Sequence, residues 1–147
     1  MSMRGALVVC SLLCMTGWAQ AADFRSVGPA PVVMYDAPSR SAKRLYVASP
    51  LYPLEVIVNL EAWVKVRDHT GALSWIEKKQ LSERRTVLVT SPTIDVLARP
   101  EEGAPSVLQI GQDVALELVE VSTAGWLRVR HDSGATGFVR ANAVWGR

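Results

Sequence analysis

Two fourteen-residue segments carry most of the side chains that could take part in binding. Residues 63–76 read WVKVRDHTGALSWI, and residues 126–139 read WLRVRHDSGATGFV. In each segment a Trp is followed by alternating basic residues, so an indole lies beside two cations. An indole stacks on a planar or sugar-like group, and neighbouring cations attract carboxylates. This combination suits an anionic peptide or a glycan as the ligand.

Strand parity indicates which of these side chains face outward. If residues 63–67 form a strand, Val64 and Val66 share one face and the Trp and both basic residues share the other. An aliphatic face belongs inside a barrel, so the Trp faces should lie outside, near solvent or a groove. The candidate ligand-binding residues are Trp63, Lys65, Arg67, Trp75, Trp126, Arg128 and Arg130. The alternative is that an indole covers a barrel end or packs against the other repeat, which we expect of at least one of the two.

The two histidines, His69 and His131, are expected on hairpin turns. Residues 68–71 and 131–134 contain the Asp, the Ser or Thr, and the Gly that tight turns favour. Neither His has a second His or a carboxylate cluster at metal-ligand spacing. We therefore predict no metal site, no cofactor and no catalytic residue.

Residues 1–21 are typical of a secretory signal peptide. Arg4 supplies a positive charge, residues 6–15 are an apolar run, and residues 19–21 have the small-x-small form of a processing site. Cleavage is expected before Ala22. The apolar run is shorter than the roughly 20 residues that cross a bilayer, and no later run is longer. No membrane span is therefore predicted in the mature chain.

Both cysteines lie in this leader. Without Cys10 and Cys14 the mature chain has no disulfide, no thiolate metal site and no thiol catalyst. Val9 and Leu13 precede them, whereas a lipid-anchored precursor needs a small residue there, which argues against a lipoprotein. Removing one Arg leaves 16 − 1 = 15 basic against 14 acidic residues. No long block of like charge occurs, which argues against nucleic-acid binding.

The chain is a tandem repeat. Trp63 and Trp126 are 126 − 63 = 63 residues apart, whereas residues 54–57 and 116–119 are related by an offset of 62, because one residue is inserted before the second Trp. Extending the alignment in both directions gives repeats at 24–85 and 86–147.

Strand signals dominate both repeats, and no segment is convincing as a helix. Short β-branched or aromatic runs are bounded by Pro, Gly, Ser and Asp at the spacing of a small barrel. Strands are predicted at 32–36, 44–48, 54–60, 63–67, 73–77, 86–90, 93–97, 107–110, 114–121, 126–130 and 136–140. Residues 78–80 and 141–143 should each form one tight helical turn. The apolar residues Leu51, Tyr52 and Leu54 fit a contact between repeats, an exposed patch for another protein, or the core.

The order of these features resembles the bacterial SH3 (SH3b) modules of exported proteins. The resemblance rests on features that follow one another in this order: a Pro-containing loop, a Glu-containing hydrophobic strand, Trp-x-Lys/Arg-Val-Arg, Gly, Trp/Phe-Ile/Val and a short polar turn. The two copies of this motif together cover nearly the whole mature chain. Residues 33–39 resemble the opening of a poorly characterised proteobacterial subgroup. Residues 95–100 lack the Arg and the Gly of the common Asn-Val-Arg-x-Gly-Pro opening, as does the first repeat. The implied fold is all-β: two tandem small SH3-like barrels behind a cleaved signal peptide.

This resemblance implies a non-catalytic binding module of the cell envelope, exported and periplasmic, with peptidoglycan or a short peptide as ligand. The alternative is a structural adaptor that docks on an envelope protein. SH3b modules are commonly attached to a hydrolase, but the leader and two repeats leave almost no residues for one here. A small hydrolase with an unrecognised site is the third class. Its support is weak, because the mature chain has no Cys and its acidic residues are scattered.

Overall fold

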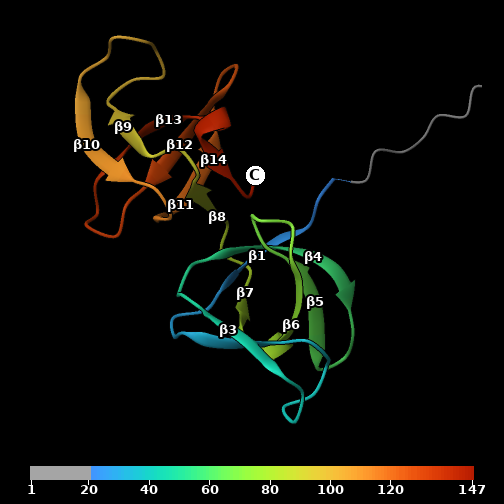
Figure 1. Cartoon of the computed structure of the whole chain (residues 1–147). Coiled ribbons are helices and arrows are strands. Elements are labelled where there is room, and N and C mark those ends of the chain that lie inside the picture. The colour runs from blue at the N-terminus through green and yellow to red at the C-terminus, as the bar shows by residue number, and fades with distance from the viewer. Residues whose placement is uncertain (1–20) are drawn as a thin grey trace, which may run out of the picture.

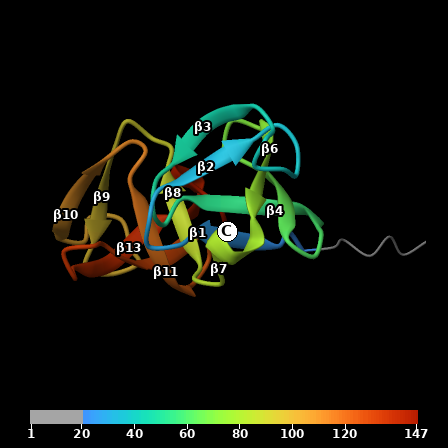
Figure 2. The ribbon, with the colours of Figure 1, turned by 90° about the horizontal axis from the view of Figure 1, so that it is seen from below.

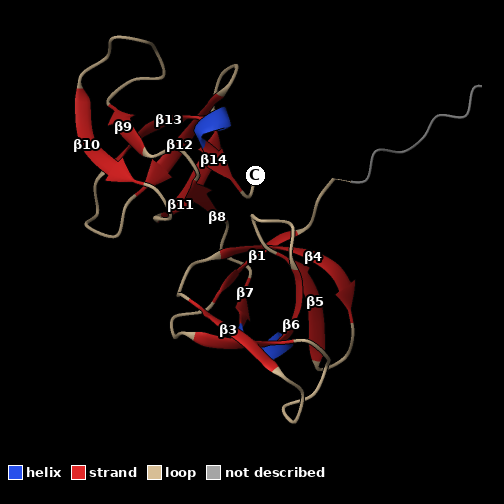
Figure 3. Ribbon diagram, viewed as in Figure 1, coloured by secondary structure: helices blue, strands red, loops and turns tan. Residues whose placement is uncertain are grey.

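The computed structural model describes residues 21–147, which form two seven-stranded antiparallel sheets (Figures 1 and 3). The predicted signal peptide, residues 1–21, lies outside the described residues except for Ala21. The part of the chain described has two 3-10 turns and no α-helix, so the all-β prediction is confirmed. Within it, no helix has the length and apolar character needed to cross a membrane.

The two units have the same topology. The first unit consists of β1 (Phe24–Val27), β2 (Val32–Tyr35), β3 (Arg44–Ala48), β4 (Pro53–Asn59), β5 (Trp63–Arg67), β6 (Leu73–Glu77), η1 (Lys78–Gln80) and β7 (Leu81–Ser82). The second consists of β8 (Thr86–Val89), β9 (Thr93–Leu97), β10 (Ser106–Gly111), β11 (Ala115–Val121), β12 (Trp126–Arg130), β13 (Thr136–Arg140), η2 (Ala141–Ala143) and β14 (Val144–Trp145). The strand order β3-β2-β6-β5-β4-β1-β7 recurs as β10-β9-β13-β12-β11-β8-β14. Each strand therefore has a counterpart seven places later, and Figure 2 shows both curled sheets next to each other.

The eleven predicted strands and both predicted turns are present, with ends that differ by a residue or so. Three short strands, β1, β7 and β14, were not predicted. β1 has only four residues and is held by pairing with β4 on one side and β7 on the other. Its local sequence signal is weak, although the alignment of the repeats sets it against the predicted strand at 86–90.

Each sheet closes around its own aliphatic core. In β5 the side chains of Val64 and Val66 are fully buried, as are Leu127 and Val129 in β12, so the predicted parity is confirmed. Burying such a side chain stabilises the fold by about 1.5–3 kcal/mol. The first core comprises Val27, Val32, Met34, Ala48, Leu54, Val64, Val66 and Ile76. The second comprises Val87, Val89, Val96, Ile110, Leu116, Leu127, Val129, Val139, Ala141 and Val144.

The two units meet through β8 and β14. The buried Thr86 hydroxyl donates a hydrogen bond of 2.7 Å to the Leu51 carbonyl. The Trp145 ring meets Phe24 edge to face, with ring centroids 5.1 Å apart. Leu51 therefore belongs to the contact between the units. Leu54, which the sequence left open, belongs to the first core.

Gly137 in β13 marks the closest approach between two strands of the second unit. A Cβ at this position would come within 2.6 Å of the Leu97 carbonyl oxygen and within 2.6 Å of a Val96 methyl. Its counterpart in β6 is the buried Ser74. The approach of β9 to β13 therefore leaves no room for a side chain at position 137.

Replacing this glycine should destabilise the protein. We expect Gly137→Ala to lower the free energy of unfolding by about 1–3 kcal/mol, because the added methyl must push β9 away from β13. Urea denaturation followed by Trp fluorescence measures this. The matched control is Thr136→Ala at the exposed neighbouring position, which should change stability by less than about 0.5 kcal/mol. Equal stability of both variants would contradict the close packing of β9 on β13.

Candidate ligand-binding face

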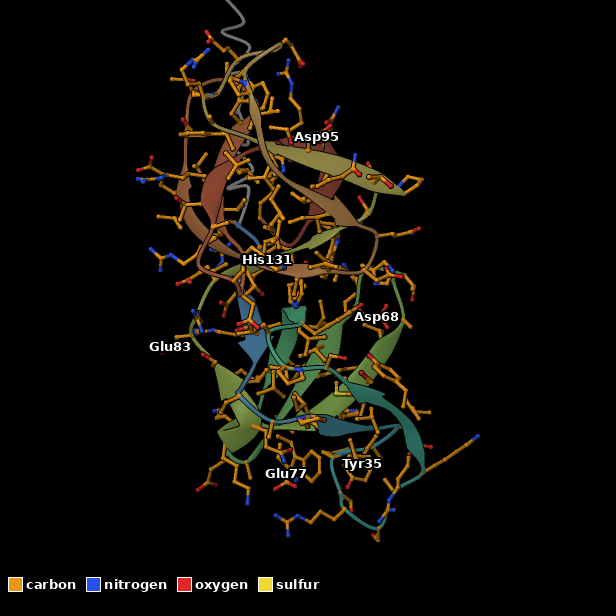
Figure 4. All side chains as sticks on the ribbon, turned by 90° about the vertical axis from the view of Figure 1, so that its left-hand side faces the viewer. Tyr35, Asp68, Glu77, Glu83, Asp95 and His131 are labelled. Atoms are coloured by element: carbon orange, nitrogen blue, oxygen red, sulfur yellow. The ribbon has the colours of Figure 1, made fainter. Side chains whose placement is uncertain are left out.

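The pairing of β5 with β6 brings the candidate residues of the first unit together. Trp63 lies opposite Glu77, and Lys65 lies opposite Trp75. On the other side of β6, Tyr35 lies opposite Trp75. Tyr35 and Glu77 are found at the end of the first unit that points away from the second (Figure 4). We call the outer side of these strands, defined by Tyr35, Trp63, Lys65 and Trp75, the aromatic face.

The rings of the aromatic face are not equally accessible. Tyr35 is buried and meets half-buried Trp63 edge to face, with centroids 5.6 Å apart and planes at 87°. Such a pair stabilises by about 0.5–1.5 kcal/mol beyond its buried area, so Trp63 is held in place. Half-buried Trp75 has the Lys65 ammonium 6.0 Å from its ring centroid. Trp63 and Trp75 are thus both partly exposed, and Trp75 is the indole that lies beside the Lys65 ammonium.

Two ion pairs border this face. Arg40 donates to both carboxylate oxygens of Glu77, at 3.0 and 2.7 Å. These hydrogen bonds hold the pKa of the Glu77 carboxyl below its usual value and raise the pKa of Arg40. Arg67, the third candidate in β5, pairs with Glu55 at 3.1 Å. Lys65, in contrast, forms no ion pair within residues 21–147 and remains available to a ligand carboxylate.

In the second unit the charges of the bordering ion pair are exchanged. Arg140 stands where the first unit has Glu77, and Glu102 stands where it has Arg40. The Arg140 Nε donates to Glu102 at 2.7 Å. The Arg140 guanidinium also lies 4.3 Å from the centroid of Trp126, which is its cross-strand partner. The Arg40–Glu77 pair therefore lies beside Trp63 in the first unit, whereas in the second unit the equivalent pair covers Trp126.

Trp126 was predicted to lie near solvent or a groove; it is not near solvent, but it does line a pocket. The side chain points outward as parity requires, but only 6% of it is exposed. Arg140 lies over the ring, and the loop that carries buried Ala104 closes beside it. The alternative of a covered indole thus holds for Trp126. The residue that covers it, Arg140, belongs to the same unit.

The remaining candidates of the second unit are exposed but paired. Arg128 lies 4.0 Å from Glu120, and Arg130 lies 3.3 Å from Glu117. Phe138 replaces Trp75 and is half-buried. The structure therefore does not merge the two sets of candidates into one site. Among residues 21–147, the first unit presents a half-buried indole, Trp75, beside Lys65, a cation that forms no ion pair there.

Beside Trp126 lies a pocket of about 440 Å³ that the sequence did not reveal. Leu97 occupies the position of Tyr35, and the smaller side chain leaves space next to the indole. The walls include Asp95, Glu102 and Arg140. The signal available in the sequence was the exchange of Tyr for Leu and of the two charges between aligned repeats.

The hairpin turns expected around the histidines are confirmed. Asp68 is buried and accepts hydrogen bonds from the backbone N–H of Thr70 and Ala72, at 2.9 and 3.1 Å. In the second unit, His131 Nδ1 takes the same role and accepts the Ser133 N–H at 3.1 Å. Gly71 has a φ of +89°, as such a turn requires. Residues 21–147 contain no group of three His, Cys, Asp or Glu placed to hold a metal ion.

A polar cluster around the Asp68 turn of the first unit has no counterpart in the second. The Tyr52 hydroxyl is hydrogen-bonded to His69 Nδ1, and the Tyr46 hydroxyl donates to Asp68 at 3.2 Å. Burial raises the pKa of Tyr52 to about 12 and also raises the pKa of Tyr46. The second unit has Val114 and Leu108 at these two tyrosine positions.

This cluster should make the protein less stable at alkaline pH. Between about pH 10 and pH 12 the folded chain keeps the Tyr52 proton that the unfolded chain loses, so stability falls as pH rises through this range. The slope is at most about 1.4 kcal/mol per pH unit, and smaller because Tyr52 is only half-buried. Urea denaturation at several alkaline pH values should show a shallower slope for Tyr52→Phe. An unchanged slope would contradict this assignment.

Comparison with known sequences gives a match in both units. A family model described as "Bacterial SH3 domain" matches residues 28–83 and, a second time, residues 91–146. No curated protein sequence matches the chain.

Several solved structures are similar to this chain at low sequence identity. NlpC1 from Trichomonas vaginalis shares 16% identity with a TM-score of 0.40, and the match covers 97% of this chain and 52% of that one. NlpC2 from the same organism shares 14% identity with a TM-score of 0.40, covering 87% and 49%. An NlpC/P60 family protein from Bacillus cereus shares 19% identity with a TM-score of 0.39, covering 83% and 55%. The chain spans about half the length of each.

Proposed function

Because the chain belongs to the bacterial SH3 domain family, in two copies, we propose that it is a non-catalytic binding module of the cell envelope. The observation that carries this proposal is the aromatic face of the first unit. There an accessible indole, Trp75, lies beside Lys65, a cation without a carboxylate partner in residues 21–147. The second unit contributes a matching fold whose own indole is covered.

The proposed ligand is peptidoglycan or a short anionic peptide. The indole of Trp75 offers a flat apolar surface to a sugar ring or a planar peptide group. The Lys65 ammonium can form a charge-assisted hydrogen bond with a ligand carboxylate. The family resemblance of the sequence points to the same class of ligand.

Retention on purified peptidoglycan tests this proposal. We expect the Lys65→Ala, Trp75→Ala double variant to bind at least about thirtyfold more weakly, as for loss of an aromatic hot spot. The matched control is Arg128→Ala, Phe138→Ala, which changes the equivalent positions of the second unit and should bind as the wild type does. Circular dichroism confirms that both variants fold.

Three outcomes of this assay would contradict the proposal. Absence of wild-type retention would remove peptidoglycan as the ligand, and equal loss in both double variants would remove the assignment to the first unit. Release of soluble fragments from the peptidoglycan would show that the protein is an enzyme.

The adaptor alternative retains one specific observation. Residues 50–54, which the sequence offered as a docking patch, are occupied by the contact between units and by the core. The edge strand β3, however, exposes Val47 to 62% and Leu45 to 42%. An exposed sheet edge can accept an added strand from a partner protein. Crosslinking in cells from position 47 to a single envelope protein, without peptidoglycan retention, would favour this function.

Export through a cleaved leader is part of the proposal. Expressed in full, the protein should be recovered from the periplasmic fraction with an intact mass that corresponds to a chain beginning at Ala22. Replacing Ala19 and Ala21 by bulky residues should block this processing. Recovery of the wild-type chain from the cytoplasm with Met1 retained would contradict export.

A further inference from the structure

A second pocket, of about 290 Å³, opens in the first unit where β4, β5, η1 and β7 meet. Its floor is apolar and consists of Val56, Val64 and Leu81. Its rim is polar and consists of Arg25, Asn59, Lys78, Ser82 and Glu83. The pocket is distinct from the aromatic face, because Val64 points to the inside of β5 whereas Trp63 and Lys65 point to the outside.

At the aligned positions of the second unit, the floor residues are also apolar, but the rim residues are no longer polar. The floor residues correspond to Leu118, Leu127 and Val144, which are all apolar. The rim residues correspond to Val87, Val121, Ala141, Trp145 and Gly146, which carry no side-chain charge and, apart from the Trp indole N–H, no polar side-chain atom. The same topology is therefore built with an apolar rim, so the fold does not require the polar one.

Part of this difference has a structural cause, and part does not. Trp145 packs on Phe24, and a Cβ on Gly146 would meet Pro53 at 2.9 Å, so both residues are fitted to the contact between units. That contact does not account for Lys78 in place of Ala or Asn59 in place of Val.

The rim carries both signs of charge, since Arg25 and Lys78 are positive and Glu83 is negative. Arg25 pairs with Asp23 at 3.2 Å and with Glu83 at 3.1 Å, but the Glu83 side chain is 92% exposed and held only at its tip. Lys78 takes part in none of the ion pairs of residues 21–147. A ligand carboxylate can therefore pair with Lys78 and compete with the exposed Glu83 for Arg25.

We propose that this pocket binds a carboxylate carried on a small aliphatic group, as at the C-terminus of a peptide. The carboxylate lies between Lys78 and Arg25 at the rim. The aliphatic group enters the pocket and contacts Val56, Val64 and Leu81. The site is separate from the aromatic face and does not depend on the function proposed for that face.

A titration with a matched pair of probes tests the site. N-acetyl-leucine carries the carboxylate and the aliphatic group, and N-acetyl-leucinamide has the same shape without the charge. In methyl nuclear magnetic resonance spectra, the acid should shift the signals of Val56, Val64 and Leu81 in a saturable way, and the amide should bind at least about tenfold more weakly. Binding of the acid should weaken as the salt concentration rises.

Two variants of adjacent lysines supply the matched control. Lys78→Ala introduces the residue that the second unit carries at this position and should weaken binding of the acid about tenfold. Lys79→Ala removes the same charge from the exposed neighbouring position and should leave the affinity unchanged.

The proposal is overturned if the acid causes no saturable shift at the three floor residues, if the amide binds equally well, or if Lys79→Ala weakens binding as much as Lys78→Ala. Shifts confined to the Trp63 and Trp75 indole signals would also overturn it, because the probe would then occupy the aromatic face. Loss of peptidoglycan retention in the Lys65→Ala, Trp75→Ala variant has no bearing on this titration, so the two proposals fail separately.

Discussion

The cross-strand register between β5 and β6, repeated between β12 and β13, decides whether each outward indole can meet a ligand. The register places Glu77 opposite Trp63 and Arg140 opposite Trp126. The face of an indole carries partial negative charge, so it attracts a guanidinium and does not attract a carboxylate. Arg140 accordingly lies over its Trp at 4.3 Å, whereas the Glu77 carboxylate is held by Arg40. One exchange of charge between the repeats thus separates a covered indole from a partly open one.

The second unit contributes side chains to the contact between the units and has paired arginines on its outer face. A domain of this size buries a smaller fraction of its surface than a larger domain does, so contact with a neighbour matters to its stability. Thr86 and Trp145 supply that contact from β8 and β14. The second unit also pairs its exposed Arg128 and Arg130 with Glu120 and Glu117. The first unit keeps Lys65 and Lys78 outside the ion pairs of residues 21–147, and both of its candidate sites contain one of them.

The sequence predicted what depends on local alternation and missed what depends on distant partners. Valines and leucines at alternate positions of β5 and β12 were enough to assign both strands and their inner faces. Burial of Trp126 depends on Arg140 and on the loop around Ala104, neither of which is a neighbour in sequence. The pocket rim is likewise assembled from β1, β4, η1, β7 and Glu83 after β7. An alignment of the repeats by polarity indicates part of the difference around Trp126. It sets Arg40 and Glu77 against Glu102 and Arg140, so the exchange of charge is visible in the sequence.

The two candidate sites of the first unit lie on opposite sides of the same strand. Trp63 and Lys65 project from β5 outward, and Val64 between them forms part of the pocket floor. A short ligand that fills the pocket therefore cannot also cover the aromatic face. A polymer that carries many sugar rings and many peptide carboxylates can engage both at once through different repeats of its own structure. Since the second contact is then intramolecular, two weak sites give tight retention on the polymer and weak binding of its fragments.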